Sequence, residues 1–269
     1  MKKTGTVFLH ATLILLCAIS LFPIYWMINT SFKSAGEIFS LSLIPMDFTF
    51  DNYLTAAGTM PLGRMILNSF IFTIPLVLLQ LVFAILFAYA FSRWTFKGKK
   101  VIYSILTLSW LIPLQAIMVP NYVAVTEMSM NGTVMGMIVP NMVSVFACLQ
   151  LFDAFELIPR SLYGAAELDG SNSFQTLIHI AIPTVKSSIF SLSIILMITA
   201  WNSYLWPSLV STSLDNSLIQ VGLKSYVSGE SYQYGALMAA STMACLPIFI
   251  VYIVFLRQIQ NVNMQSGIK

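Results

Sequence analysis

The chain has 269 residues, of which 58% are apolar and only 9% are charged, and its formal net charge is +3. Soluble domains contain about 45–50% apolar and about 25% charged residues. So few charges cannot cover a water-facing surface. The composition therefore excludes a water-soluble globular protein and predicts that most of the exterior faces lipid.

Six windows of the chain lack Asp, Glu, Lys and Arg, and each is longer than the ~20 residues that cross a bilayer as a helix. Helices are expected because backbone groups in lipid must bond within their own segment. We therefore expect an all-α integral membrane protein with one transmembrane domain over residues 1–269. Its six transmembrane helices are expected at about 8–30, 66–92, 101–125, 133–155, 187–207 and 234–256.

The first apolar stretch follows Lys2 and Lys3, so a cleaved signal peptide is one interpretation. Its apolar run continues past Pro23 to Met27 and meets no small-residue cleavage pattern. We therefore expect a retained membrane anchor.

The connections between the spans divide the basic residues unequally. With the amino terminus in the cytoplasm, ten of the 13 Lys and Arg residues lie inside, and only Lys33, Arg64 and Lys224 lie outside. Lys and Arg gather on the cytoplasmic side of membrane proteins. This predicts a multi-pass protein with both termini cytoplasmic, an inner segment at 159–186 and an outer loop at 208–232.

The sequence shows no clear site for driving transport by an ion gradient or by ATP hydrolysis. Among ionisable residues of the kind that mark ion pathways, the charge-free windows contain His10, near the inner edge of the first span. A phosphate-binding loop of the G-x-x-x-x-G-K-[ST] type is absent, so a carrier of this kind needs a partner that hydrolyses ATP. Cys17, Cys148 and Cys245 all fall within spans, where we expect buried apolar side chains and not metal ligands.

The inner segment 159–186 has the pattern of a short surface helix. Pro159 ends the fourth span, Ser161 is the expected N-cap, and Gly170 is the expected left-handed stop. A second helical stretch, 174–182, is expected to end at Pro183. The residues alone leave two interpretations about even: a helix that docks on another protein, and a helix that only covers the bundle.

The fifth span ends in aromatic and amide side chains. Trp201, Asn202 and Tyr204 together suit a sugar, which presents an apolar face and a rim of hydroxyls, so they are candidates for a substrate pathway. Asn68 and Asn141 are further candidates, although such amides bond neighbouring helices as readily as a ligand. Trp206 is expected in the aromatic belt at the outer membrane interface.

An ordered set of motifs resembles one family. Ala165-Ala166 followed by Asp169-Gly170, with Phe174 and Pro183 after them, resembles the coupling motif of bacterial ATP-binding-cassette (ABC) import permeases. The stretches 68–70, 88–93, 96–99, 201–207 and 267–269 are similar to carbohydrate-uptake permeases, above all to the maltose-type second permease. One departure is Gly164, where the family usually has Glu; a glycine inside a helix costs about 1 kcal/mol relative to alanine.

The resemblance implies the transmembrane domain of a type-1 ABC importer in a bacterial inner (plasma) membrane, with a cytoplasmic coupling helix. It implies that contact with the ATPase involves the following residues: Leu162, Ala165, Ala166, Leu168, Asp169, Gly170 and Pro183. It also implies an outer loop that reaches the binding protein, and the expected tip of that loop is Val227, Ser228, Gly229 and Glu230.

The implied function is import of a sugar delivered by an extracytoplasmic substrate-binding protein. The implied partners are a second permease, forming a heterodimer, and two ATPase subunits that carry ATP and Mg²⁺. No cofactor is expected in this chain, and nucleic acid is not an expected partner. Glycerol phosphate, which the family also carries, is the alternative cargo. A non-transport scaffold or a membrane enzyme is disfavoured, because a scaffold leaves the coupling motif unexplained and no paired carboxylates or nucleophile–base set accompany the spans.

Overall fold

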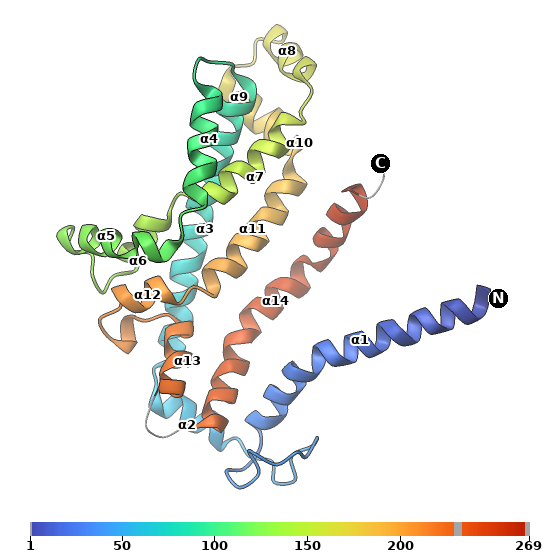
Figure 1. Ribbon diagram of the computed structural model, residues 1–269, viewed down its shortest axis with the longest axis vertical. Coiled ribbons are helices and arrows are strands. Elements are labelled where there is room, and N and C mark those ends of the chain that lie inside the picture. Colours follow the sequence, from blue (N-terminus) through green and yellow to red (C-terminus); the bar gives the residue numbers. More distant parts are fainter. Residues whose placement is uncertain (1, 229–232, 267–269) are drawn as a thin grey trace.

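The computed structural model describes residues 2–228 and 233–266, with side chains from 6 to 227 and from 233 to 255. Over these residues the fold is a bundle of helices (Figure 1). The only β-bridge in this part of the chain is an isolated antiparallel one between Lys33 and Phe48. The predicted all-α fold is confirmed.

The elements follow one another along the chain as α1 (Lys2–Ser31), α2 (Asp51–Thr59), α3 (Leu62–Arg93), α4 (Lys99–Trp110), α5 (Leu114–Glu127), α6 (Val134–Ile138), η1 (Val139–Asn141), α7 (Val145–Glu156), α8 (Arg160–Leu168), α9 (Ser173–Thr176), η2 (Leu177–Ala181), α10 (Ile182–Thr184), α11 (Lys186–Trp201), α12 (Leu205–Val210), η3 (Leu214–Asn216), α13 (Ile219–Ser228) and α14 (Tyr234–Ser266).

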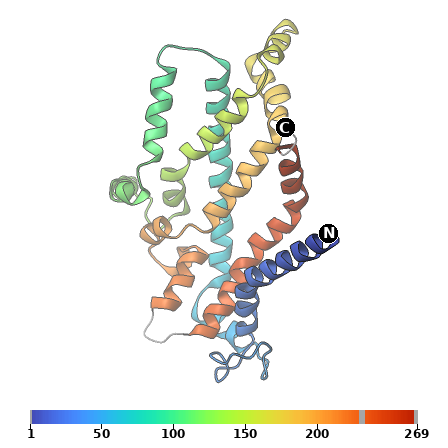
Figure 2. The same cartoon turned by 45° about the vertical axis from the view of Figure 1, so that its right-hand side comes forward.

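Four stretches of the described chain form helices long and apolar enough to cross a membrane: Thr6–Ser31, Leu62–Arg93, Lys186–Val210 and Tyr234–Phe255. Two bent pairs, α4 with α5 and α6–η1 with α7, raise the number to as many as six if each pair is one span. The central helix is α3, which packs against α7 and α11 (Figures 1 and 2).

Three of the six expected transmembrane ranges, 101–125, 133–155 and 187–207, are interrupted by breaks between helices. Helices α4 and α5 meet at 94°, where Pro113 takes an extended backbone conformation and begins the next helix. The pair α6–η1 and α7 bends by 47°, and Ser144 restarts the chain by capping α7. Helix α11 ends at Trp201, before α12 begins at Leu205. Proline and capping residues give the first two breaks a local cause, and at the third Asn202 is the C-cap of α11, with its side chain donating to the Ile198 carbonyl.

Helix α1 is held only by its carboxyl-terminal end. Side chains 6–25 are exposed, whereas Asn29, Thr30 and Ser31 are buried, and the first half of α1 stands away from the bundle in both views (Figures 1 and 2). The segment after α1 folds around Lys33, whose ammonium is fully buried and donates to the Ser40 carbonyl at 2.9 Å.

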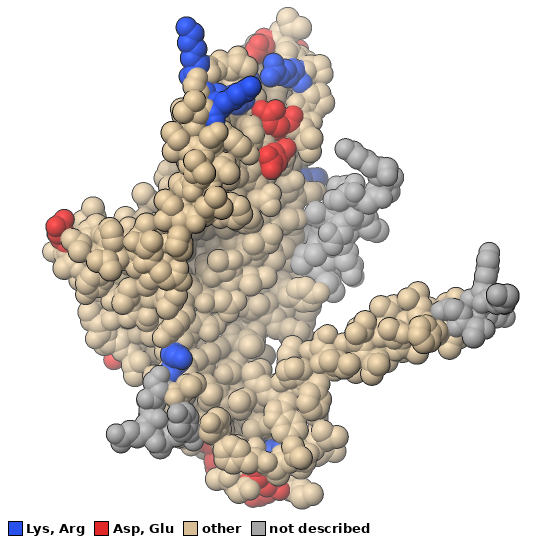
Figure 3. All heavy atoms as spheres, in the orientation of Figure 1, with Lys and Arg blue, Asp and Glu red and all other residues tan. Residues whose placement is uncertain are grey.

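The charged side chains gather at the two ends of the molecule. Most of the visible Lys and Arg side chains lie at the end that carries α4 and α8 (Figure 3). The faces between the ends carry few charged side chains (Figure 3). Cys148 is buried, but Cys17 and Cys245 are exposed on helix surfaces, so the expectation that all three cysteines are buried is wrong for those two.

Candidate functional site

Helix α8 begins two residues earlier than the sequence suggested. Its N-cap is Pro159, and Ser161 lies inside the helix, so the expected cap at Ser161 is wrong. Proline at this position leaves no side-chain cap, and Leu162 N–H bonds back to the Pro159 carbonyl at 3.0 Å. A glutamate at Gly164 would therefore not complete a capping box with Ser161.

The end of α8 has the form predicted from Gly170. Gly170 adopts a φ of 75°, its N–H bonds the Glu167 carbonyl at 3.1 Å, and Ser171 N–H bonds the Ala166 carbonyl at 2.9 Å. These two bonds form a Schellman motif, which satisfies the last free carbonyls of a helix. The chain therefore turns sharply after α8 and exposes its final turn.

The two faces of α8 differ in burial. Tyr163 and Ala166 are buried, at 7% and 3% exposure, against the chain's own bundle. Burial raises the pKa of the Tyr163 hydroxyl above its ordinary value. On the other side Ala165 is exposed and Leu168 is 91% exposed. We call the exposed apolar residues at this end of the molecule the coupling surface: Leu157, Leu162, Ala165, Leu168 and Phe174.

The segment after α8 is ordered by a capping box that our reading of the sequence missed. Asn172 accepts from Gln175 N–H at 2.8 Å, and the Gln175 side chain accepts from Asn172 N–H at 2.9 Å. An Asn followed three residues later by Gln is a local signal for this motif.

The helical path then continues past Pro183 to Thr184, although we expected it to end at Pro183. A π turn at η2 precedes the proline and accommodates its missing N–H.

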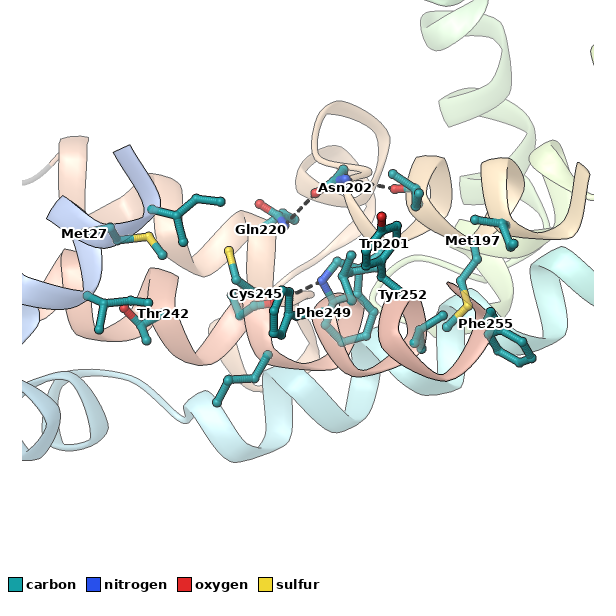
Figure 4. Close-up of a pocket in the computed structure, with 18 residues that line it drawn as sticks. Met27, Met197, Trp201, Asn202, Gln220, Thr242, Cys245, Phe249, Tyr252 and Phe255 are labelled. Atoms are coloured by element: carbon teal, nitrogen blue, oxygen red, sulfur yellow. Dashed lines mark hydrogen bonds between the residues drawn. The ribbon is translucent and has the colours of Figure 1, made fainter. Parts of the chain in front are cut away.

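A cavity of about 500 Å³ lies between α1, α11, α13 and α14 (Figure 4). Its lining is mostly apolar, and two polar residues meet at one side, where Gln220 Nε2 donates to Asn202 Oδ1 at 3.2 Å. Asn202 also donates to the Ile198 carbonyl at 2.9 Å. Gln220, on α13, is a candidate that the sequence did not reveal, because it meets Asn202 only through the fold.

Trp201 lines the same cavity. It is buried, at 1% exposure, its indole N–H donates to the Ala244 carbonyl at 3.2 Å, and its ring packs edge-to-face on Phe70 of α3 at 4.9 Å between centroids. The indole thus joins α11 to both α3 and α14.

The other pathway candidates lie apart from the cavity. Asn68 donates to the backbone carbonyls of Asp215 at 2.8 Å and Ser217 at 3.2 Å, which ties α3 to the segment around η3. The Asn141 amide donates to the Met137 carbonyl at 3.1 Å. Tyr204 lies between α11 and α12 and is not among the lining residues.

Trp206 lies inside the bundle. It is 2% exposed and donates to the Met137 carbonyl at 3.1 Å. Its expected place in an interfacial aromatic belt is therefore wrong.

The expected outer loop contains the helix α13. Tyr226 of α13 is buried and donates to the Ala56 carbonyl at 3.0 Å, which holds α13 against α2. Val227 is 43% exposed near the end of α13 and Ser228 is its last residue, whereas Gly229 and Glu230 lie outside the described residues. Within the described chain no group of three or more His, Cys, Asp or Glu could hold a metal ion.

Comparison with known proteins identifies the family. A model of the family described as "Binding-protein-dependent transport system inner membrane component" matches residues 80–263. The chain is 31% identical over 266 residues to the inner membrane ABC transporter permease protein YcjP of Escherichia coli (strain K12), covering 97% of this chain and 95% of that protein. It is 29% identical to the diacetylchitobiose uptake system permease protein NgcG of Streptomyces coelicolor, covering 93% and 84%.

A solved structure shares the fold. The match is to a chain of a bacterial ABC transporter involved in the import of the acidic polysaccharide alginate, with a TM-score of 0.81 and 21% identity, covering 95% of this chain and 96% of that chain. At this identity the likeness concerns the fold alone.

The chain therefore belongs to the binding-protein-dependent transport system inner membrane component family. It is an ABC transporter permease of the inner membrane, and permease subunits of this family are not enzymes. Membership implies an ATPase and a substrate-binding protein as partners.

Proposed function

We propose that this permease moves a sugar, either a monosaccharide or an oligosaccharide, that an extracytoplasmic binding protein delivers. In this proposal the chain forms a heterodimer with a second permease. Two ATPase subunits bind ATP and Mg²⁺, the chain itself holds no cofactor, and both termini are cytoplasmic. The similarity to a diacetylchitobiose uptake permease supports a sugar as cargo.

The observation that carries the coupling part of the proposal is the coupling surface. Leu168 and Phe174 are 91% and 70% exposed on the most charged end of the molecule, where water and not lipid is the expected neighbour. Burying one such side chain is worth about 1.5–3 kcal/mol. A protein partner is the natural cover for this surface, and the separate ATPase is the partner whose energy the permease needs.

Within the motif, the roles are divided by burial. Leu162, Ala165 and Leu168 are exposed and are proposed to contact the ATPase. Ala166, Asp169, Gly170 and Pro183 are proposed to shape the segment: Ala166 packs inward, and Gly170 makes the turn that presents Leu168.

For the substrate pathway we propose Trp201 and Asn202, joined by Gln220. An apolar cavity with two amides at one side suits a sugar ring, because the ring has an apolar face and hydroxyls that both donate and accept. The described lining contains no Lys or Arg to meet a phosphate, which favours a neutral sugar over glycerol phosphate.

The whole proposal is tested by reconstituting the chain in vesicles with its second permease, ATPase and binding protein. We expect uptake of a labelled neutral sugar that requires both ATP and the binding protein. Glycerol phosphate is the competing cargo in the same assay. Uptake of glycerol phosphate alone would contradict the sugar assignment, and no uptake of either with an active ATPase would contradict the transport assignment as stated.

The tip of the outer segment is proposed to contact the binding protein, through residues 227–230. Removal of residues 227–231 should reduce uptake and leave the ATPase bound, because α13, which ends at Ser228, lies far from α8 (Figure 1). Unchanged uptake in this variant would reduce the segment to a simple connection.

A further inference from the structure

A buried arginine joins the end of α3 to the coupling helix α8. The Arg93 side chain is only 8% exposed, and its Nη2 contacts Glu167 Oε1 at 2.7 Å. Its Nη1 donates to the Tyr89 hydroxyl. The guanidinium carbon lies 5.5, 5.2 and 5.7 Å from the ring centroids of Tyr89, Trp94 and Tyr163. We call these five residues the Arg93 clamp.

The Arg93 clamp attaches the coupling segment at two points. Tyr163 and Glu167 both belong to α8, one on the buried face and the other on the exposed side. The Tyr89 hydroxyl donates in turn to the Ser173 carbonyl at 2.9 Å, at the start of α9. The turn that ends α8 is therefore held on both sides by residues from one turn of α3.

The contact is stronger than an ordinary surface ion pair. Glu167 is 63% exposed, and pairs between exposed side chains contribute little to stability. Arg93, however, is largely removed from water, so the loss of its carboxylate would leave a desolvated cation. Three aromatic rings and a planar guanidinium also fix the direction of the contact, which a flexible Lys would not.

Helix α3 connects the Arg93 clamp with the proposed substrate pathway. It is a single helix from Leu62 to Arg93 with Pro75 inside it, and near its other end Phe70 packs on the Trp201 indole at 4.9 Å. The 23 positions between residues 70 and 93 correspond to about 35 Å of helix at a rise of 1.5 Å per residue. Helix α3 thus contacts α8 at one end and, through Phe70 near the other, the Trp201 side chain that lines the cavity.

We propose that Arg93 is a positioning residue that makes α8 and α3 move together, so that a displacement of α8 by the ATPase reaches Trp201 along α3. This inference rests on the proposed docking of α8 on the ATPase. It assigns to Glu167 a role inside the permease, in which its carboxylate holds Arg93 and does not bind the ATPase.

The test replaces Glu167, which is exposed enough to be changed without opening the core. The matched control is Glu156→Ala, because Glu156 pairs with Lys99 at 3.3 Å at the same end of the molecule but joins α4 to α7 and not to α8. The complete transporter is reconstituted in vesicles, and three quantities are measured: ATPase retained on purification, ATP hydrolysed, and labelled sugar imported.

For Glu167→Ala we expect normal retention of the ATPase and a rise of about fivefold or more in ATP hydrolysed per sugar imported, the lower end of usual coupling effects. Glu167→Gln should lie between Glu167→Ala and the unchanged protein, because its amide oxygen still accepts from Arg93. Glu156→Ala should leave the ratio unchanged.

A ratio in Glu167→Ala equal to that of Glu156→Ala would overturn the inference. Loss of the ATPase from Glu167→Ala would also overturn it, because Glu167 would then be a direct docking contact, as the proposed function alone allows. An unchanged permease that retains no ATPase would overturn the proposed function, and this inference with it.

Discussion

At the scale of single residues, three amides that look equivalent in the sequence have different roles in the structure. The Asn68 amide donates to backbone carbonyls of the segment around η3, and the Asn141 amide donates to the carbonyl four residues before it. Asn202 alone of the three lines the cavity, where it meets Gln220. Asn68 therefore ties two parts of the fold together, whereas Asn202 is available to a ligand.

We predict that Asn202→Ala weakens the affinity for the sugar and hardly changes stability, because the side chain is exposed and its strongest bond lies within its own helix. Loss of one hydrogen bond to the sugar corresponds to an increase of about two- to tenfold in the KM of uptake. Uptake kinetics and the melting temperature are measured on the same protein.

The matched variant is Asn68→Ala, which removes two bonds between α3 and the η3 segment. It should lower the melting temperature and leave KM unaltered. If Asn202→Ala behaved like Asn68→Ala, Asn202 would be a structural residue and would leave the pathway.

Gly164 stands where the family usually has Glu, and the packing around it does not require a glycine. A Cβ built at Gly164 meets nothing within 4 Å, so a larger side chain would fit. Glu167, the acidic residue of α8, has its carboxylate paired with Arg93. In our proposal, Glu167 therefore does not take over the contact that the missing glutamate would make to a partner.

At the scale of elements, α8 is divided between two neighbours. Its inward side belongs to the permease through Tyr163 and Ala166, and its outward side is open through Ala165 and Leu168. The two alanines of the family motif thus differ in burial although they are adjacent, since neighbouring helix residues point about 100° apart.

This division gives a prediction for the two alanines. Ala165→Trp should leave the isolated permease as stable as before and weaken its binding to the ATPase, because the new ring stands on the coupling surface. Ala166→Trp should instead destabilise the permease itself, since overfilling a packed site costs about 1–3 kcal/mol. Melting temperature and ATPase retention are compared for both.

The prediction fails if Ala165→Trp retains a fully coupled ATPase. In that case the exposed side of α8 is not the docking face, and the coupling surface would need another partner.

At the scale of the whole molecule, most charged side chains lie towards the two ends, and the region between the ends carries few of them (Figure 3). The coupling surface lies at the basic end, where Lys97 lies between α3 and α4 and where Lys99 and Lys100 begin α4. The buried Lys33 is at the opposite end, folded under Ser40 and 4.5 Å from the Trp26 ring centroid, so its charge is shielded from the membrane surface. The arrangement agrees with a cytoplasmic position for α8.

We predict that single cysteines at the two ends react from opposite sides of the membrane. In a background without Cys17, Cys148 and Cys245, Lys97→Cys should react with a membrane-impermeant maleimide only from the cytoplasmic side. Thr212→Cys, exposed between α12 and η3, should react only from outside. Labelling in sealed vesicles of known orientation measures both, and reaction from the same side would contradict the proposed topology.

The sequence alone determined the features that depend on composition or on residues close together in the chain. The paucity of charge predicted a helical membrane protein, and Gly170 predicted the end of α8, because a left-handed stop needs only the local backbone. The family could also be recognised from the sequence, since each of its motifs is short and contiguous. The capping box at Asn172 was equally local and was missed.

Only the tertiary structure decided the features that depend on distant neighbours. Arg93 and Glu167 are 74 positions apart, and no local pattern pairs them. Trp206 is of a residue type common at the membrane interface, but it lies inside the bundle, because the Met137 carbonyl accepts from its indole N–H. Which alanine of the motif faces outward was decided in the same way. Burial is a property of the packed neighbours, and these neighbours come from elements far away in the chain.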